Sequence, residues 1–181
     1  MNATPTWRRS KLLTIGWQDA GLMLDALASA VRGAGFAPTV IAGIARGGLP
    51  PAVALSNLLG VTGFRILGIP RNSGNGRYSE RGEARLDYVV PEGSLAGERV
   101  LIVDDIMGDG GTMALAERTV RGLGAAEVRS AVVVRNVGSR SLPDFFAVEV
   151  DDWTVFPWEE QPDEGRTTGA LRAGVPRGAG R

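Results

Sequence analysis

Residues 100–113 constrain the fold of this chain more than any other stretch, with the sequence VLIVDDIMGDGGTM. Four apolar residues in a row are typical of a strand that is buried on both faces of a sheet. We expect this strand to end in Asp104 and Asp105, a glycine-containing turn to follow, and Thr112 to open a helix. In open parallel sheets, ligands bind beyond the carboxyl ends of the strands. The stretch therefore predicts an α/β sheet with a ligand site at its edge.

The same alternation of strand and helix runs along most of the chain. Helical apolar spacing and short β-branched runs predict helices at 17–31, 49–59 and 112–123, and strands at 39–45, 64–69, 85–90, 99–103 and 128–135. Alternating elements with uninterrupted apolar strands are typical of a parallel sheet that is covered on both faces. A chain of 181 residues has room for one such domain.

Three regions lack this pattern. We expect residues 1–13 to form an irregular N-terminal arm and residues 161–181, rich in Gly, Arg and Pro, to form a flexible tail, which leaves 14–160 as the folded domain. Residues 70–83 (PRNSGNGRYSERGE) have no apolar periodicity, and we expect either a functional loop or a solvated linker there.

Composition excludes several classes of chemistry. The chain has no cysteine and no histidine, which excludes disulfides, thiolate nucleophiles, Cys/His zinc sites and Ser-His-Asp triads. Its 20 basic and 20 acidic residues give zero net charge, which argues against nucleic-acid binding. No apolar run approaches the roughly 20 residues that span a bilayer, and the N-terminus lacks a secretory signal pattern. We therefore expect a cytoplasmic protein without nucleic-acid or membrane partners.

The turn at residues 108–112 is suited to an anion. Its glycines let successive backbone N–H groups approach a ligand at a helix N-terminus, where a phosphate can bind without a cationic side chain. The neighbouring Asp104 and Asp105 would repel a bare polyphosphate, but they suit sugar hydroxyls or a magnesium ion. A sugar phosphate satisfies both halves of the site. The sequence contains no GxxxxGK[ST] motif, and no GxGxxG follows a strand.

VLIVDDIMGDGGT resembles the phosphoribosyl-pyrophosphate (PRPP) signature of type I phosphoribosyltransferases. The resemblance implies a central parallel sheet flanked by helices, with a small C-terminal hood, in which 14–160 is the phosphoribosyltransferase domain. It implies an Mg²⁺-dependent transferase that moves ribose 5-phosphate from PRPP to a nitrogenous base and releases pyrophosphate. Asp104 and Asp105 would be catalytic residues that hold the ribose hydroxyls near the metal. The 5-phosphate would be bound by Met107, Gly108, Asp109, Gly110, Gly111 and Thr112.

A second segment, IAGIARGGL at residues 41–49, resembles the pyrophosphate loop of the same enzymes. By that resemblance, the pyrophosphate would be bound by Ala45, Arg46, Gly47 and Gly48. Family members often have a cis peptide bond in this loop, which here would join Ala45 to Arg46. Residues 70–83 occupy the position of the family's flexible catalytic loop.

The segment at residues 132–159 resembles the base-binding end of bacterial and archaeal 6-oxopurine phosphoribosyltransferases. Arg135, Trp153 and Thr154 would contact the base, and Glu159 would lie near the metal and pyrophosphate. Arg135 replaces the usual lysine, and a fork of donors replaces a point charge.

The residues around the acceptor base depart from the family pattern. The family's general-base aspartate is replaced by Gly108, and Asp109 follows one place later as the candidate general base. We favour a purine acceptor, in salvage or in a specialised nucleoside pathway. Two alternatives stay open, namely a non-purine acceptor and a non-catalytic regulator that binds PRPP. The resemblance is also compatible with a homodimer.

Overall fold

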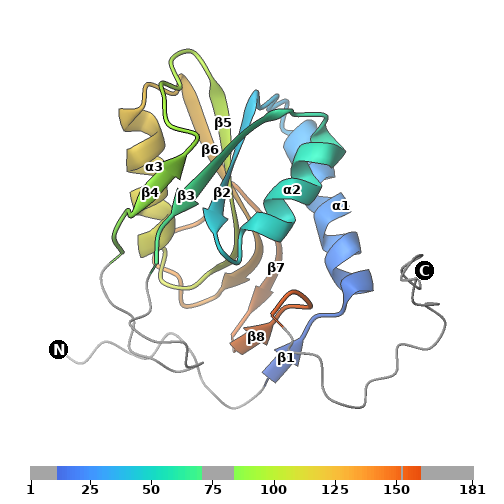
Figure 1. The fold of residues 1–181 in the computed structure, drawn as a ribbon. Coiled ribbons are helices and arrows are strands. Elements are labelled where there is room, and N and C mark those ends of the chain that lie inside the picture. The colour runs from blue at the N-terminus through green and yellow to red at the C-terminus, as the bar shows by residue number, and fades with distance from the viewer. Residues whose placement is uncertain (1–11, 71–83, 152, 160–181) are drawn as a thin grey trace, which may run out of the picture.

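A six-stranded sheet forms the centre of the computed structural model, which describes residues 12–70, 84–151 and 153–159 (Figure 1). The elements, in order, are β1 (Leu12–Thr14), α1 (Trp17–Gly33), β2 (Val40–Ala45), α2 (Leu49–Leu59), β3 (Gly63–Gly68), β4 (Tyr88–Val90), β5 (Arg99–Met107), α3 (Gly111–Gly122), β6 (Glu127–Asn136), β7 (Phe145–Val150) and β8 (Trp153–Val155). Most of the predicted arm, all of the predicted tail, and 71–83 of the predicted loop lie outside the described residues.

The central sheet has the strand order β4-β3-β2-β5-β6-β7. All neighbouring strands are parallel except β4, which pairs antiparallel with β3. The predicted α/β fold with a mainly parallel sheet is therefore confirmed, with one antiparallel edge strand added.

Both faces of the sheet are covered, and β5 shows how. Leu101 and Val103 point into the core that α1 and α2 cover, whereas Val100 and Ile102 point into the core beneath α3. All four are fully buried. The period of two along a strand explains why this run is apolar without interruption.

The boundaries of the helices follow the sequence closely, and that of β5 does not. α2 has the predicted bounds, and prolines occupy its first turn, where no intrahelical N–H bond is lost. The prediction that the strand ends at the two acids is wrong, because β5 continues past them to Met107. It continues because Asp104 still pairs with Val132 of β6, and Met107 with Arg135.

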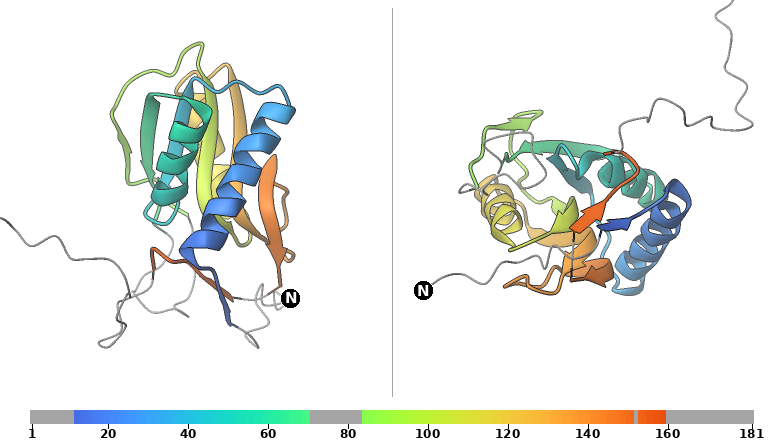
Figure 2. Two further views of the ribbon diagram at one scale, coloured as in Figure 1. Left: turned by 90° about the vertical axis from the view of Figure 1, so that its right-hand side faces the viewer. Right: turned by 90° about the horizontal axis from the view of Figure 1, so that it is seen from below.

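A second, two-stranded sheet lies beyond the carboxyl ends of the central strands (Figures 1 and 2). β1 and β8 form it in parallel, and Ile15 N–H extends the pairing to Val155 O at 2.9 Å. This is the predicted hood, although it is not purely C-terminal. Residues 12 and 13, predicted to belong to the irregular arm, lie in its strand β1. Within the described ranges, no helix is long and apolar enough to cross a membrane.

Candidate functional site

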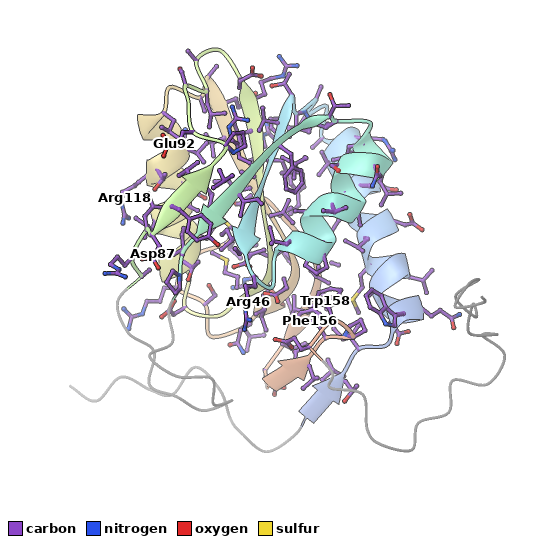
Figure 3. The ribbon with its side chains drawn as sticks, in the orientation of Figure 1. Arg46, Asp87, Glu92, Arg118, Phe156 and Trp158 are labelled. Carbon is purple, nitrogen blue, oxygen red and sulfur yellow. The ribbon has the colours of Figure 1, made fainter. Side chains whose placement is uncertain are left out.

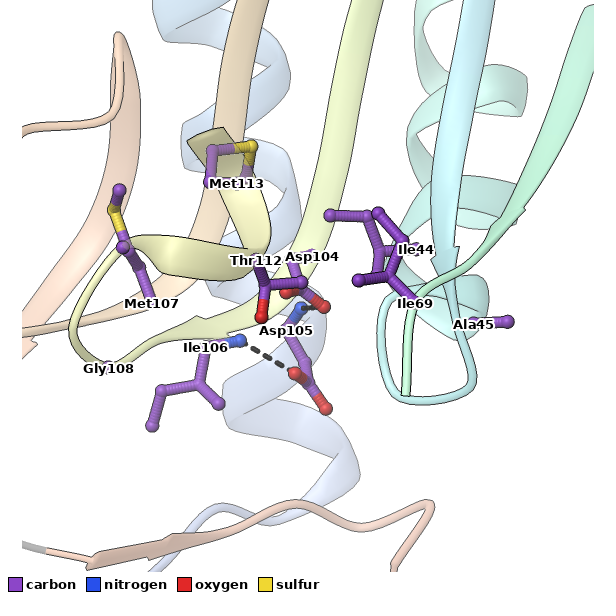
Figure 4. Close-up of a pocket in the computed structure, with 11 residues that line it drawn as sticks. Ile44, Ala45, Ile69, Asp104, Asp105, Ile106, Met107, Gly108, Thr112 and Met113 are labelled. Carbon is purple, nitrogen blue, oxygen red and sulfur yellow. Dashed lines mark hydrogen bonds between the residues drawn. The ribbon is translucent and has the colours of Figure 1, made fainter. Parts of the chain in front are cut away.

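A cavity of about 200 Å³ opens at the carboxyl edge of the central sheet (Figure 4). The predicted site residues that line it are Ala45, Asp104, Asp105, Met107, Gly108, Gly110 and Thr112. Sequence reasoning missed its apolar wall, which consists of Ile44, Ile69, Ile106 and Met113. These residues lie in or just beyond elements that end at this edge, so the strand prediction could have indicated them. The structure thus brings the two predicted phosphate loops to one cavity.

The two acids of β5 lie side by side, Asp105 buried and Asp104 half-buried. Asp105 is only 7% exposed. Burial and the nearby charge of Glu159 together raise the pKa of Asp105 to about 6, and the N–H of Ile106, 2.7 Å from Oδ1, partly opposes the rise. Burial and the charge of Asp105 raise the pKa of Asp104 well above its ordinary value. A pair of this kind favours a ligand that supplies hydroxyl donors or a cation.

The glycine turn after β5 leads directly into α3. Gly110 has a φ of 89° in the left-handed region, and an added Cβ there would lie 2.3 Å from the Ser141 hydroxyl, so the position requires glycine. α3 begins at Gly111, one residue before the predicted Thr112, with Gly110 as its N-cap and no side-chain cap. The first-turn N–H groups of α3 therefore have no acceptor within the helix, as an anion site requires.

Asp109 contributes to the shape of this turn. Its Oδ1 accepts the N–H of Gly111 at 2.9 Å, which occupies one amide of the predicted phosphate cradle. Asp109 and Gly111 do not line the cavity, whereas Gly108 and Thr112 do.

The predicted pyrophosphate loop, between β2 and α2, lies against the acids. The Ala45–Arg46 peptide bond is cis, as the family resemblance predicts. An added Cβ at Gly47 would lie 2.0 Å from Asp105 Oδ2, and one at Gly48 would lie 2.6 Å from the Val103 carbonyl oxygen. Both glycines thus allow the loop to approach β5. Arg46 lies on the same loop, at the edge of the sheet that faces the hood (Figure 3).

The predicted base-binding residues are less assembled. Arg135 forms an ion pair with Glu149 of β7, and its guanidinium lies 5.9 Å from the centre of the Phe146 ring. Sequence reasoning missed this pair because β7 itself was not predicted. Thr154 is 4% exposed, and its hydroxyl has no hydrogen-bond partner among the residues that the structure describes. Neither Arg135 nor Thr154 lines the cavity, and the side chain of Trp153 lies outside the described residues.

The predicted metal ligands were Asp104, Asp105 and Glu159. Within 12–70, 84–151 and 153–159, no cluster of three or more Asp, Glu, His or Cys side chains could hold a metal by itself. Glu159 accepts a hydrogen bond from the N–H of Phe156 at 3.0 Å, and its negative charge raises the pKa of Asp105. Mg²⁺ usually binds to one or two carboxylates together with water and substrate phosphates. Two adjacent acids beside the predicted phosphate turn therefore fit an Mg²⁺ that arrives with a phosphate-bearing substrate.

The chain is similar to known proteins over most of its length. The model of the phosphoribosyl transferase domain matches residues 19–164. The adenine phosphoribosyltransferase of Parafrankia sp. is 40% identical over 118 residues, which cover 63% of this chain and 62% of that enzyme. The adenine phosphoribosyltransferase of Saccharopolyspora erythraea is 38% identical over 133 residues, which cover 68% of this chain and 71% of that enzyme.

The match to a solved structure extends further along the chain. The crystal structure of the purine phosphoribosyltransferase from Pyrococcus horikoshii superimposes with a TM-score of 0.71 and 32% identity, covering 83% of this chain and 95% of that one. The alignment with the Parafrankia enzyme, by contrast, spans slightly less than two thirds of its length. Since the family model matches most of the chain, including both predicted phosphate loops, this protein belongs to the type I phosphoribosyltransferase family.

Proposed function

We propose that this protein transfers ribose 5-phosphate from PRPP to a purine base, with release of pyrophosphate. One observation carries the proposal: two adjacent acids, a glycine turn at a helix N-terminus and the β2–α2 loop share one edge of the sheet. The relatives named adenine and purine phosphoribosyltransferase support the same reaction.

Each part of the edge has a role in this reaction. The carboxylates of Asp104 and Asp105 accept hydrogen bonds from the ribose hydroxyls, and their negative charge stabilises the oxocarbenium character that develops at the ribose. The first turn of α3 donates N–H groups to the 5-phosphate. The loop that contains Arg46 holds the pyrophosphate as it leaves, and the base nitrogen attacks from the opposite face. Catalysis then comes from positioning and electrostatics rather than from a covalent intermediate.

The residues Asp104 and Asp105 would hold Mg²⁺ together with the oxygens of PRPP. When bound, the metal supplies positive charge that neutralises the pyrophosphate. We propose Mg²⁺ dependence on this basis, and we keep Glu159 as a residue that acts on the site through its charge.

Adenine is our first choice of acceptor, with the 6-oxopurines second. The base-binding segment resembles 6-oxopurine enzymes, in which a lysine faces the 6-oxygen. Here the guanidinium of Arg135 is already paired with the carboxylate of Glu149, which weakens its field at a keto oxygen. The same carboxylate offers an acceptor for an amino group. The adenine phosphoribosyltransferase relatives point in the same direction.

Pyrophosphate release tests this proposal directly. The protein is incubated with PRPP and Mg²⁺ and with adenine, guanine, hypoxanthine, xanthine, uracil or orotate in turn. We expect release with purines, most rapidly with adenine. Release only with uracil or orotate would establish a non-purine acceptor. Binding of PRPP without release in any mixture would establish a regulator instead. A cytoplasmic location, a homodimer and the domain limits of 14–160 remain predictions.

A further inference from the structure

The carboxylate of Asp105 is enclosed by three separate elements. On its own strand, Oδ1 accepts the N–H of Ile106 at 2.7 Å. The β2–α2 loop presses against Oδ2, since an added Cβ at Gly47 would lie 2.0 Å from it. The indole N–H of Trp158, in the segment that follows β8, lies near enough to favour the charged carboxylate. The first contact comes from β5, the second from the predicted pyrophosphate loop, and the third from the turn that follows β8 of the hood.

The ring of Trp158 is held in place by its own neighbours. It stacks on Phe156 with 4.8 Å between ring centres and an angle of 10°, and it meets Trp17 of α1 edge-on at 6.0 Å. Phe156 is fully buried. The turn that carries both rings is closed twice: Phe156 N–H bonds to Glu159 Oε2, and Glu159 N–H bonds to Phe156 O, both at 3.0 Å. The indole is therefore held by its ring contacts within a closed turn.

The indole nitrogen is buried, and no described residue accepts a hydrogen bond from it with full geometry. A buried donor without a partner costs free energy, whereas a phenylalanine would fill the same stack without that cost. Packing therefore explains why an aromatic ring occupies position 158, but it does not explain why that ring carries a buried N–H donor. The Asp105 carboxylate is the polar group on which this N–H acts.

We infer that Trp158 is a positioning residue: its indole N–H orients the Asp105 carboxylate toward the ribose and so couples the β1–β8 hood to the donor site. This inference rests on the proposed function, because PRPP is the ligand for which Asp105 is oriented. It assigns to the hood a role on the ribose side of the reaction, in addition to the base side.

The matched variants are Trp158→Phe and Trp17→Phe. Trp158→Phe keeps the stack on Phe156 and removes the indole N–H. Trp17→Phe makes the same change at the other ring of the edge-on pair, and the Trp17 side chain is 67% exposed. We expect Trp158→Phe to raise the Kd of PRPP, measured by calorimetry with Mg²⁺, about tenfold. That factor corresponds to the loss of about 1.4 kcal/mol, near the value of one hydrogen bond to a charged group. The KM for PRPP should rise by the same factor while kcat changes less than threefold.

Two results would overturn the inference. One is unchanged PRPP binding in Trp158→Phe, and the other is equal weakening in Trp17→Phe, because general ring packing would then be sufficient. Trp17→Phe should bind PRPP as the parent protein does.

A double-mutant cycle without PRPP separates this inference from the proposed function. Urea unfolding at pH 8 compares the effect of Trp158→Phe in the parent protein with its effect in an Asp105→Asn background. We expect the change in the unfolding equilibrium constant to differ about tenfold between the two backgrounds. Equal effects would overturn the inference even if PRPP binds. If the parent protein does not bind PRPP but the cycle shows coupling, the proposed function fails and only the contact remains.

Discussion

Replacing Asp105 by asparagine should make the protein more stable near neutral pH while it abolishes PRPP binding. The pKa of Asp105 is about 6 in the folded protein, about 2 above the value of about 3.9 for an unfolded aspartate. The folded state therefore binds the proton more tightly. The contribution of the Asp105 proton to the free energy of unfolding is fully present below pH 4, and it is lost as the pH rises to about 6 and above. Each pKa unit corresponds to about 1.36 kcal/mol, so the loss of unfolding free energy is about 3 kcal/mol.

The asparagine side chain is uncharged, so it does not suffer this loss. Relative to the parent protein, Asp105→Asn should gain about 3 kcal/mol of unfolding free energy between pH 4 and pH 8. Asparagine keeps an oxygen that can accept the Ile106 N–H, which leaves the local backbone bond intact. The assay is urea unfolding of both proteins at each pH, with the difference between them plotted against pH.

The control is Asp25→Asn on the exposed side of α1, where the change should stay within about 0.5 kcal/mol at every pH. The reasoning would be refuted if the stability difference between Asp105→Asn and the parent protein were the same at pH 4 and pH 8. A loss of stability at pH 8 that exceeds the loss at pH 4 would refute it more strongly. Gain of stability together with loss of ligand binding is the expected behaviour of a buried acid kept for function.

Three further changes probe the rest of the site. Gly47→Ala places a Cβ 2.0 Å from Asp105 Oδ2, and turnover should fall at least about 100-fold. The control is Gly21→Ala on the exposed side of α1, where no atom lies near the added Cβ and turnover should be unchanged. If Asp109 is the general base, Asp109→Asn should lower kcat about 10²–10⁴-fold and flatten its pH profile, and unchanged turnover across pH would exclude that role. Glu149→Gln removes the ion pair of Arg135 and should shift kcat/KM from adenine toward hypoxanthine about tenfold; an unaltered ratio would show that the pair does not select the base.

Local sequence patterns are sufficient to predict the elements that form the proposed PRPP site. The apolar run of β5 and the glycine turn after it placed Asp104 and Asp105 at the sheet edge. The end of the strand was misplaced because two acids normally stop a buried strand. Here β6 continues the pairing past them, which is a tertiary effect that no local pattern contains.

The hood shows the other limit of sequence reasoning. β1 and β8 are three residues each and pair across most of the chain, so neither has a periodicity of its own. The sequence analysis predicts neither β7 nor β8. It therefore contains no signal for the Arg135–Glu149 ion pair or for the approach of Trp158 to Asp105. Contacts of this kind depend on which strands lie side by side, and that arrangement is known only from the folded chain.

The central claim is most directly tested by a crystal structure of the protein with PRPP and Mg²⁺. We predict that the ribose hydroxyls lie within hydrogen-bond distance of Asp104 and Asp105, and that the 5-phosphate lies on the first turn of α3. Density for PRPP at another place, or none at these acids and this turn at saturating concentration, would contradict the account. An unexpected base in the acceptor position would leave it intact.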